Sequence, residues 1–160
     1  MDSATSTLFT ADELDALLLG LCWTMEDEEP SVATAAATAC EKIAAMLPEP
    51  PAMELERPDP NPDDPSGSFW VPFLEAAAEA ETRLSLTYRD KAGSGSSRVI
   101  WPLMLDSWRQ PEVIVAWCET RLDFRVFRVD RIQALELLDR YPVRRQVLMA
   151  KWQLREEQEQ

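Results

Sequence analysis

Seven prolines between residues 48 and 65 divide this chain into two parts. Proline lacks a backbone N–H, so it cannot continue a helix or pair within a sheet, and we expect an extended, solvated connection there. Helical periodicity precedes this stretch, and alternating β-type periodicity dominates after residue 81. The sequence therefore predicts an α+β protein with a helical hairpin at 8–47, a linker at 48–68, a β domain at 69–145 and a C-terminal helix and tail at 146–160.

The segment before the prolines has the pattern of an antiparallel helical hairpin. In "TADE", Thr10 is followed three residues later by Glu13, which is the spacing of a capping box, and leucines then recur on one helical face. Pro30 suits the first turn of a second helix. A DNA-reading helix-turn-helix is disfavoured, because residues 1–41 contain no lysine or arginine to contact a phosphate backbone.

After a short helix near Pro72, five stretches have strand character: 82–89, 97–105, 112–118, 123–129 and 132–138. In the first, Leu84 and Leu86 alternate with polar residues, and "DKAGSGSS" follows as a hairpin connection. Pro102 predicts an edge position or a bulge in the second strand. Five short antiparallel strands of this kind usually curl into a small barrel.

The charge of the chain is unevenly distributed. The formal net charge is -13, but residues 83–145 hold 12 basic and 8 acidic side chains, whereas residues 1–82 hold 2 basic and 18 acidic ones. Affinity for duplex DNA comes from neutralising many phosphates with a broad basic face. We therefore expect no direct reading of duplex DNA, and the local basic character of the β domain predicts that this domain binds an anion.

That basic character peaks in "AWCETRLDFRVFRVDRI", residues 116–132, where aromatic and β-branched residues alternate with Arg121, Arg125, Arg128 and Arg131. A guanidinium group is planar and always charged, and its paired donors match phosphate or carboxylate oxygens. Beside an aromatic ring it can also hold a flat group such as a base.

Two alternatives to a ligand-binding strand remain open. The arginines could pair within the chain with Glu119, Asp123 or Asp130, for example in a local salt bridge between Asp130 and Arg131. The segment could also be a helix with three of its arginines on one face, although its β-branched and aromatic residues favour a strand.

Several classes of chemistry lack their usual residues. The chain has no histidine, no glycine-rich nucleotide loop and no carboxylates at metal-ligand spacing, so we expect no enzyme, no cofactor and no metal site. Its three cysteines lie far apart, which predicts reduced, buried thiols. No run of eighteen apolar residues and no secretory signal is visible, so we expect a cytoplasmic protein without a membrane span.

Four stretches resemble the WYL domain of helix-turn-helix transcription regulators that are often labelled DeoR-like or YafY-like. They are "LSLTYRD" (84–90), "SRVIWPLML" (97–105), "VAWCETRLDFRVFRVDRI" (115–132) and "LDRYPVRR" (138–145), and the resemblance extends over roughly residues 8–150. The tryptophan, tyrosine and leucine that name the domain align with Glu112, Val113 and Ile114. Because nine residues precede the first predicted helix, we also expect this chain to lack the N-terminal winged helix of those regulators.

The resemblance implies an SH3/Sm-like β-barrel that senses an anionic effector, either single-stranded nucleic acid or a nucleotide. Motif position carries the ligand-binding role to Tyr88, Arg98, Arg121, Arg125, Arg128 and Arg131. Tyr88 would offer a stacking face or its hydroxyl, Arg98 and Arg125 would bind phosphate, and Arg131 could instead lock the barrel corner. The expected partner is a second copy of the chain or a DNA-binding protein. The alternative function is a protein-interaction or dimerisation module without a small ligand.

Overall fold

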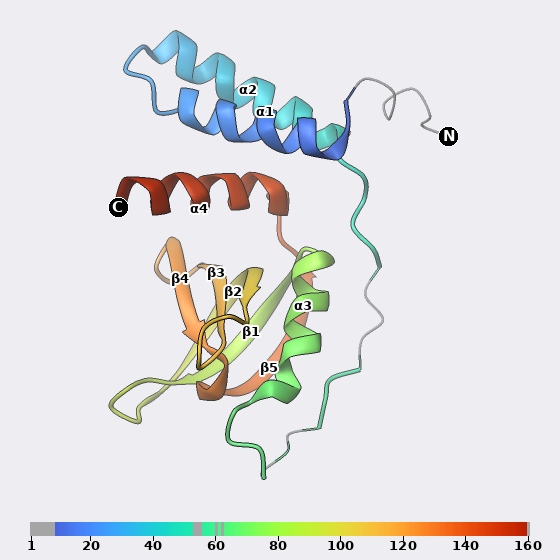
Figure 1. Ribbon diagram of the computed structural model, residues 1–160, viewed down its shortest axis with the longest axis vertical. Helices are drawn as coiled ribbons and strands as arrows, with labels where there is room; N and C mark the ends of the chain where they lie inside the picture. The colour runs from blue at the N-terminus through green and yellow to red at the C-terminus, as the bar shows by residue number, and fades with distance from the viewer. Residues whose placement is uncertain (1–8, 53–55, 60, 62, 160) are drawn as a thin grey trace. The chain divides into compact units, whose positions relative to one another are not determined.

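The computed structural model describes residues 9–159 except 53–55, 60 and 62. The first residue of the predicted hairpin segment, five positions of the predicted linker and the last residue of the predicted tail lie outside the described residues. The chain forms two compact units, Met1–Glu49 with Val143–Gln160, and Pro50–Pro142. Figure 1 labels the helices of the first unit and the helix and sheet of the second.

The first unit contains the predicted hairpin. Helix α1 spans Ala11–Thr24 and α2 spans Pro30–Met46. The capping box is present: the Thr10 hydroxyl accepts from the Glu13 N–H at 3.2 Å, and the Glu13 carboxylate accepts from the Thr10 N–H at 2.6 Å. These two bonds satisfy N–H groups that the first helical turn would otherwise leave unpaired, which fixes where α1 begins.

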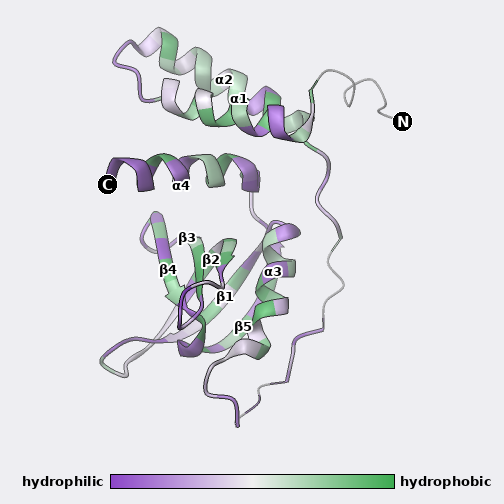
Figure 2. Cartoon of the chain, in the orientation of Figure 1, coloured by the Kyte–Doolittle hydropathy of each residue, from purple (hydrophilic) through white to green (hydrophobic). Residues whose placement is uncertain are grey.

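Helix α4, Arg145–Glu159, belongs to the same unit as the hairpin. It is mainly hydrophilic, with hydrophobic positions recurring along it (Figure 2). Val147 packs with Leu14 and Leu18 of α1, and Leu154 packs near Cys22. Among the described residues, none of the helices combines the length and apolar character that crossing a membrane requires.

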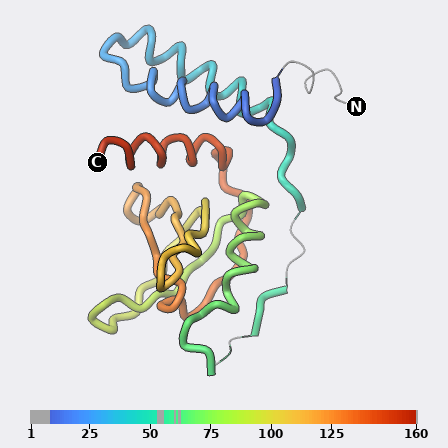
Figure 3. The backbone as a smooth tube through the Cα atoms, in the orientation of Figure 1, coloured from blue at the N-terminus to red at the C-terminus, as the bar shows by residue number. Residues whose placement is uncertain are grey.

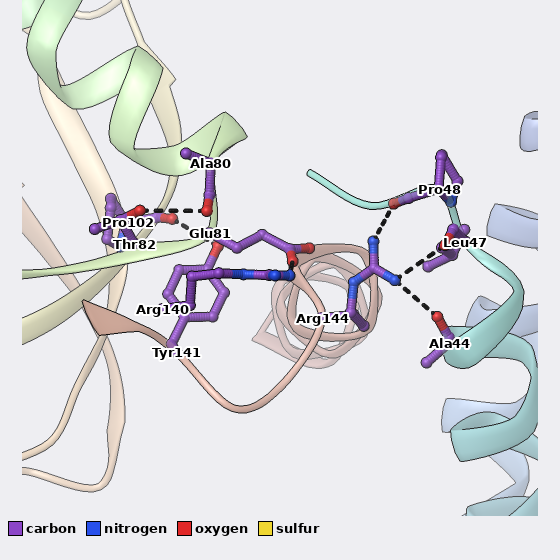
Figure 4. Close-up of polar contacts among 10 residues, drawn as sticks. All are labelled: Ala44, Leu47, Pro48, Ala80, Glu81, Thr82, Pro102, Arg140, Tyr141 and Arg144. Atoms are coloured by element: carbon purple, nitrogen blue, oxygen red, sulfur yellow. Dashed lines mark hydrogen bonds and ion pairs between the residues drawn. The ribbon is translucent and has the colours of Figure 1, made fainter. Parts of the chain in front are cut away.

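Arg144 ties α4 to the end of α2. Its Nη1 donates to the carbonyl oxygens of Ala44 and Leu47 at 2.9 and 3.2 Å, and its Nη2 donates to that of Pro48 at 2.6 Å (Figure 4). The last carbonyls of a helix lack partners within the helix and carry partial negative charge, so a guanidinium group placed there stabilises the helix end.

The second unit contains α3, Val71–Glu79, and a five-stranded antiparallel sheet. A short 3-10 helix, η2 (Ser68–Trp70), leads into α3. The strands are β1 Thr82–Arg89, β2 Gly95–Asp106, β3 Val113–Cys118, β4 Asp123–Arg128 and β5 Ile132–Arg140. They pair in the order β4-β3-β2-β1-β5. The predicted α+β class and the five predicted strands are therefore confirmed.

The connection between the last two strands forces the sheet to curl. Strands β4 and β5 are the two edges of the sheet, which would lie about 19 Å apart if five strands were laid flat. Only the 3-10 helix η3, Val129–Arg131, joins them. A 3-10 helix rises about 2 Å per residue, so the end of β4 and the start of β5 lie close together. The sheet therefore bends round into a small barrel-like structure, as Figure 1 shows.

The interior of the curled sheet is filled from η2 and α3. Trp70, Phe73 and Leu74 are almost completely buried and pack against Leu86 and Ile100 of the sheet. Burying side chains of this size contributes roughly 1.5–3 kcal/mol each. Gly67 stands just before η2 with φ +70°, and an added Cβ there would lie 2.6 Å from the carbonyl oxygen of Val129. The chain can approach the β4–β5 corner this closely because Gly67 has no side chain.

Pro102 lies at a bulge, which confirms one of its two predicted settings. Pairing between β2 and β3 shifts register between Pro102 and Met104, and β2 is an inner strand. The Pro102 carbonyl accepts from the Tyr141 hydroxyl at 3.2 Å. Close by, the buried carboxylate of Glu81 lies 3.5 Å from Arg140 Nη2 (Figure 4). The first contact joins the residue after β5 to β2, and the second joins the end of β5 to the residue before β1.

Candidate anion-binding site

Tyr88 is part of the barrel interior. Its ring packs edge-on against Phe127, with the ring centroids 5.3 Å apart. Its hydroxyl accepts a hydrogen bond from the backbone N–H of Arg128 at 3.1 Å. Because β1 and β4 are not neighbours in the sheet, this contact ties together two strands across the curl. The ring and hydroxyl of Tyr88, which the sequence assigned to a ligand, thus both make contacts within the fold.

Arg128 is paired with a carboxylate of its own chain. Its Nε and Nη2 donate to the two carboxylate oxygens of Asp130 at 3.0 and 2.7 Å. These hydrogen bonds raise the pKa of the Arg128 guanidinium above its ordinary value. The predicted local salt bridge of Asp130 therefore forms with Arg128, two residues before it, and not with Arg131.

Arg98 and Arg125 extend from the same side of the sheet. Arg98 lies opposite Leu86 and two residues before Ile100, and both of these neighbours are buried in the core. Arg125 lies two residues before the buried Phe127. Side chains two residues apart share a sheet face, and Arg98 is half-buried while Arg125 is exposed. Both arginines therefore stand where the core-facing side of the sheet meets solvent.

The surroundings of Arg98 leave its charge uncompensated. Its Nη1 lies 3.9 Å from the sulfur of the buried Cys118, which is a weak, neutral acceptor. Within the described part of the chain, neither Arg98 nor Arg125 lies within 4.0 Å of a carboxylate oxygen.

The other two predicted arginines lie at the ends of β4. Arg121 is exposed in the turn between β3 and β4. Arg131 is half-buried in η3 and lines a pocket of about 480 Å³ together with Arg89 and Lys91. Figure 3 shows the β1–β2 hairpin, which carries Arg89 and Lys91, projecting beside the start of β5. The six predicted residues thus do not form one cluster. Tyr88 contacts Arg128, while Arg98 and Arg125 share a face of the sheet. Arg131 lines the pocket with Arg89 and Lys91, and Arg121 lies in the turn between β3 and β4.

Sequence reasoning missed Arg89 and Lys91. Both lie in or beside the hairpin connection "DKAGSGSS", which carries no periodic signal. The pairing of Tyr88 with Ile132 brings this hairpin next to η3. Only a correct guess at the strand order would have placed these two cations beside Arg131.

Arg83, by contrast, is a structural cation. It forms ion pairs with Glu119, at 2.9 Å, and with Asp139. Glu119 also accepts from the Trp101 indole N–H at 2.8 Å. These hydrogen bonds, from Arg83 first and Trp101 second, hold the pKa of the Glu119 carboxyl below its ordinary value. Glu119, which was a possible partner for the predicted arginines, is therefore occupied elsewhere.

Of the three residues that align with the tryptophan, tyrosine and leucine after which the WYL domain is named, two lie in a strand. Val113 and Ile114 are buried in β3, and the Glu112 carbonyl accepts from the Val129 N–H at 2.9 Å. The Glu112 residue also lines a pocket of about 420 Å³ beside Arg128. Among the described residues, no group of three or more metal-ligating side chains is close enough to hold a metal ion.

Chemically, the barrel offers guanidinium and ammonium groups that can bind an anion. Between residues 89 and 131, six cations have no carboxylate within ion-pair distance among the described residues, namely Arg89, Lys91, Arg98, Arg121, Arg125 and Arg131. Phosphate and carboxylate oxygens are the groups that such donors recognise.

Comparison with known proteins found a matching family model and similar solved structures. The family model of the WYL domain matches residues 72–137, which include α3 from its second residue and most of the sheet. Among solved structures, the chain is similar to proteasome accessory factor B/C (PafBC) of Arthrobacter aurescens, with 21% sequence identity and a TM-score of 0.44. The match covers 84% of this chain and 22% of that one. No curated protein matches the sequence. Residues 72–137 of this chain therefore match the WYL domain.

Proposed function

We propose that this WYL domain senses an anionic effector, single-stranded nucleic acid or a nucleotide, and binds it through the arginines of the barrel. WYL domains are regulatory ligand-sensing domains of transcription regulators rather than enzymes. WYL-domain regulators bind nucleic acids and often oligomerise. The proposal adds the kind of effector and the residues that hold it.

One observation carries the proposal: the barrel leaves cations unpaired in a chain that has 29 acidic and 16 basic residues. In such a chain a cation can find a carboxylate partner, as Arg83 and Arg128 do. Arg98 and Arg125 instead share one face of the curled sheet without such a partner among the described residues. Phosphate groups of a bound strand, one contacted by each arginine, would compensate both charges and accept their paired donors.

The test is fluorescence anisotropy with a labelled single strand at moderate salt. The variant Arg98→Gln with Arg125→Gln removes the two cations and keeps polar, uncharged side chains. We expect its affinity to fall by at least about tenfold, because each charge-assisted hydrogen bond contributes roughly 1.5–3 kcal/mol. The control, Lys42→Gln with Lys151→Gln, removes two exposed charges from the helical unit and should keep the wild-type affinity. Equal binding by both double variants would remove these arginines as effector ligands.

A second candidate function is protein interaction through the helical unit. Leu17, Trp23 and Val32 are exposed on α1 and α2, and Val32 lines a shallow groove of about 380 Å³ beside Leu21. Exposed apolar groups of this kind favour association with another protein surface. Light scattering tests this: the module hypothesis predicts a dimer that Trp23→Ser converts to monomer, and a monomeric wild type that captures no partner would contradict it.

A further inference from the structure

A second group of cations surrounds a pocket that the sequence did not indicate. We call it the corner pocket. It is formed by two segments, Arg89, Asp90, Lys91 and Gly93 of the β1–β2 hairpin, and Asp130, Arg131, Ile132 and Gln133 of the β4–β5 corner. Its volume of about 480 Å³ can hold a phosphate group together with part of the molecule that carries it.

The electrostatic balance of the corner pocket is positive. It has three cations, Arg89, Lys91 and Arg131, and two carboxylates. Both carboxylates are already engaged: Asp130 accepts two hydrogen bonds from Arg128, and Asp90 accepts from the Ser94 N–H at 2.9 Å, which holds the hairpin turn. Since the Arg128 charge offsets that of Asp130, the three pocket cations face only one further carboxylate.

Arg89 is positioned without being neutralised. With the Gln133 amide oriented so that its oxygen faces the guanidinium, Arg89 donates to it from Nε at 3.2 Å and from Nη2 at 3.1 Å. An amide oxygen fixes the direction of a guanidinium group but carries no net charge. The positive charge of Arg89 therefore remains available to an anion, and the Nη1 edge of its guanidinium still has donors to offer.

The hairpin turn sets Lys91 beside this group. Asp90 N–H donates to the Ser94 carbonyl at 3.0 Å, and Gly93 N–H donates to the Asp90 carbonyl at 3.1 Å. Gly93 has φ +84°, a conformation that glycine adopts without strain. The turn is thus closed by its own hydrogen bonds, which keeps Lys91 on the loop that borders the pocket.

We propose that the corner pocket binds a phosphate monoester, such as the terminal phosphate of a nucleic-acid strand or of a nucleoside monophosphate. A monoester carries about -1.5 to -2 charge at pH 7 and three strong acceptor oxygens, one for each pocket cation. A phosphodiester within a strand carries one charge and two such oxygens, so it matches three cations less well. This inference rests on the proposed function in that it names the part of the anionic effector read at this corner.

The experiment compares two strands of identical sequence, one with a 5′-phosphate and one with a 5′-hydroxyl, each labelled at the 3′ end, by fluorescence anisotropy. We expect the wild-type protein to bind the phosphorylated strand about tenfold more tightly, the effect of roughly 1.4 kcal/mol in binding free energy. In the variant Arg89→Gln with Lys91→Gln, this ratio should fall to about one, while affinity for the hydroxyl strand changes little. The control Lys42→Gln with Lys151→Gln should keep the ratio.

The outcomes separate this inference from the proposed function. If both strands bind the wild type equally, or the preference persists in the Arg89→Gln, Lys91→Gln variant, the phosphate pocket is overturned while effector binding stands. If neither strand binds, the proposed nucleic-acid effector fails, and calorimetry with adenosine monophosphate tests whether the corner pocket binds a phosphate monoester. Adenosine monophosphate binding by the wild type that is lost in the Arg89→Gln, Lys91→Gln variant would support the inference. No binding of adenosine monophosphate by the wild type would overturn it.

Discussion

Gly67 provides a quantitative test of how the barrel corner is built. In Gly67→Ala, the new Cβ would meet the Val129 carbonyl oxygen at 2.6 Å and the carbonyl carbon at 3.2 Å, and both are backbone atoms that cannot swing away. Left-handed backbone costs a residue with a Cβ about 1–2 kcal/mol. Overpacking against fixed atoms adds roughly 1–3 kcal/mol. Reduced freedom of the unfolded chain returns about 0.4–1 kcal/mol.

The sum predicts that Gly67→Ala lowers the free energy of unfolding by about 1–4.6 kcal/mol. Each kcal/mol corresponds to roughly 2–4 °C in Tm for a chain of this size. Two glycines serve as matched controls. Gly93 has φ +84° with nothing within 4 Å, so Gly93→Ala should lose only about 1 kcal/mol. Gly95 has neither constraint, so Gly95→Ala should stay within about 0.5 kcal/mol of the wild type.

The assay is urea unfolding followed by tryptophan fluorescence, with a thermal scan by circular dichroism as a second readout. The order of destabilisation should be Gly67→Ala, then Gly93→Ala, then Gly95→Ala. A Gly67→Ala variant no less stable than Gly93→Ala would refute the close approach of the chain to the β4–β5 corner. An equal loss in all three would refute the left-handed conformations as well.

Three further predictions concern single groups. Tyr88→Phe keeps the ring contact but leaves the Arg128 N–H without its acceptor, so the free energy of unfolding should fall by about 1–3 kcal/mol in urea titrations; an unchanged value would contradict the bond. Burial raises the pKa of the Cys22 thiol to about 11. Iodoacetamide at pH 8 should therefore modify Cys22 at least about 100-fold more slowly in the native protein than in urea, as measured by peptide mass spectrometry. Similar rates in the two conditions would be inconsistent with burial. The Glu119 carboxyl has a lowered pKa because Arg83 donates to it, so its stabilising effect is present above pH 4.5 and is lost as the pH falls through the folded-state value. The urea midpoint should therefore drop less between about pH 5 and pH 3 in Glu119→Gln than in the wild type, and parallel curves would argue against this ion pair.

Local patterns predicted most of the fold because the physics that creates each element is itself local. Thr10 and Glu13 are three residues apart, and their side chains cap the start of α1. The alternation of Leu84 and Leu86 with polar neighbours predicted β1 because side chains on a strand point to opposite faces. Pro102 indicated the bulge because proline has no backbone N–H that could donate a hydrogen bond to the neighbouring strand.

Contacts between distant segments left no such signal. Arg144 meets the carbonyl oxygens of α2 from about a hundred positions away, and nothing in its own neighbourhood indicates that partner. The candidate site depended on the same kind of information. Its cations were predictable by residue type. The sequence could not show that Asp130 would form an ion pair with Arg128, or that the hairpin that carries Arg89 would lie beside Arg131.

The most direct test of the account is the salt dependence of single-strand binding by the intact protein. If uncompensated barrel cations hold the effector, log K should fall linearly with log salt concentration, with a slope of about -1.4 to -2 for two or three phosphates contacted. Removing Arg98 and Arg125 together should make that slope shallower by about 1.4, since each contact contributes roughly 0.7. Binding that is indifferent to salt, or absent at the lowest salt concentration, would contradict the account.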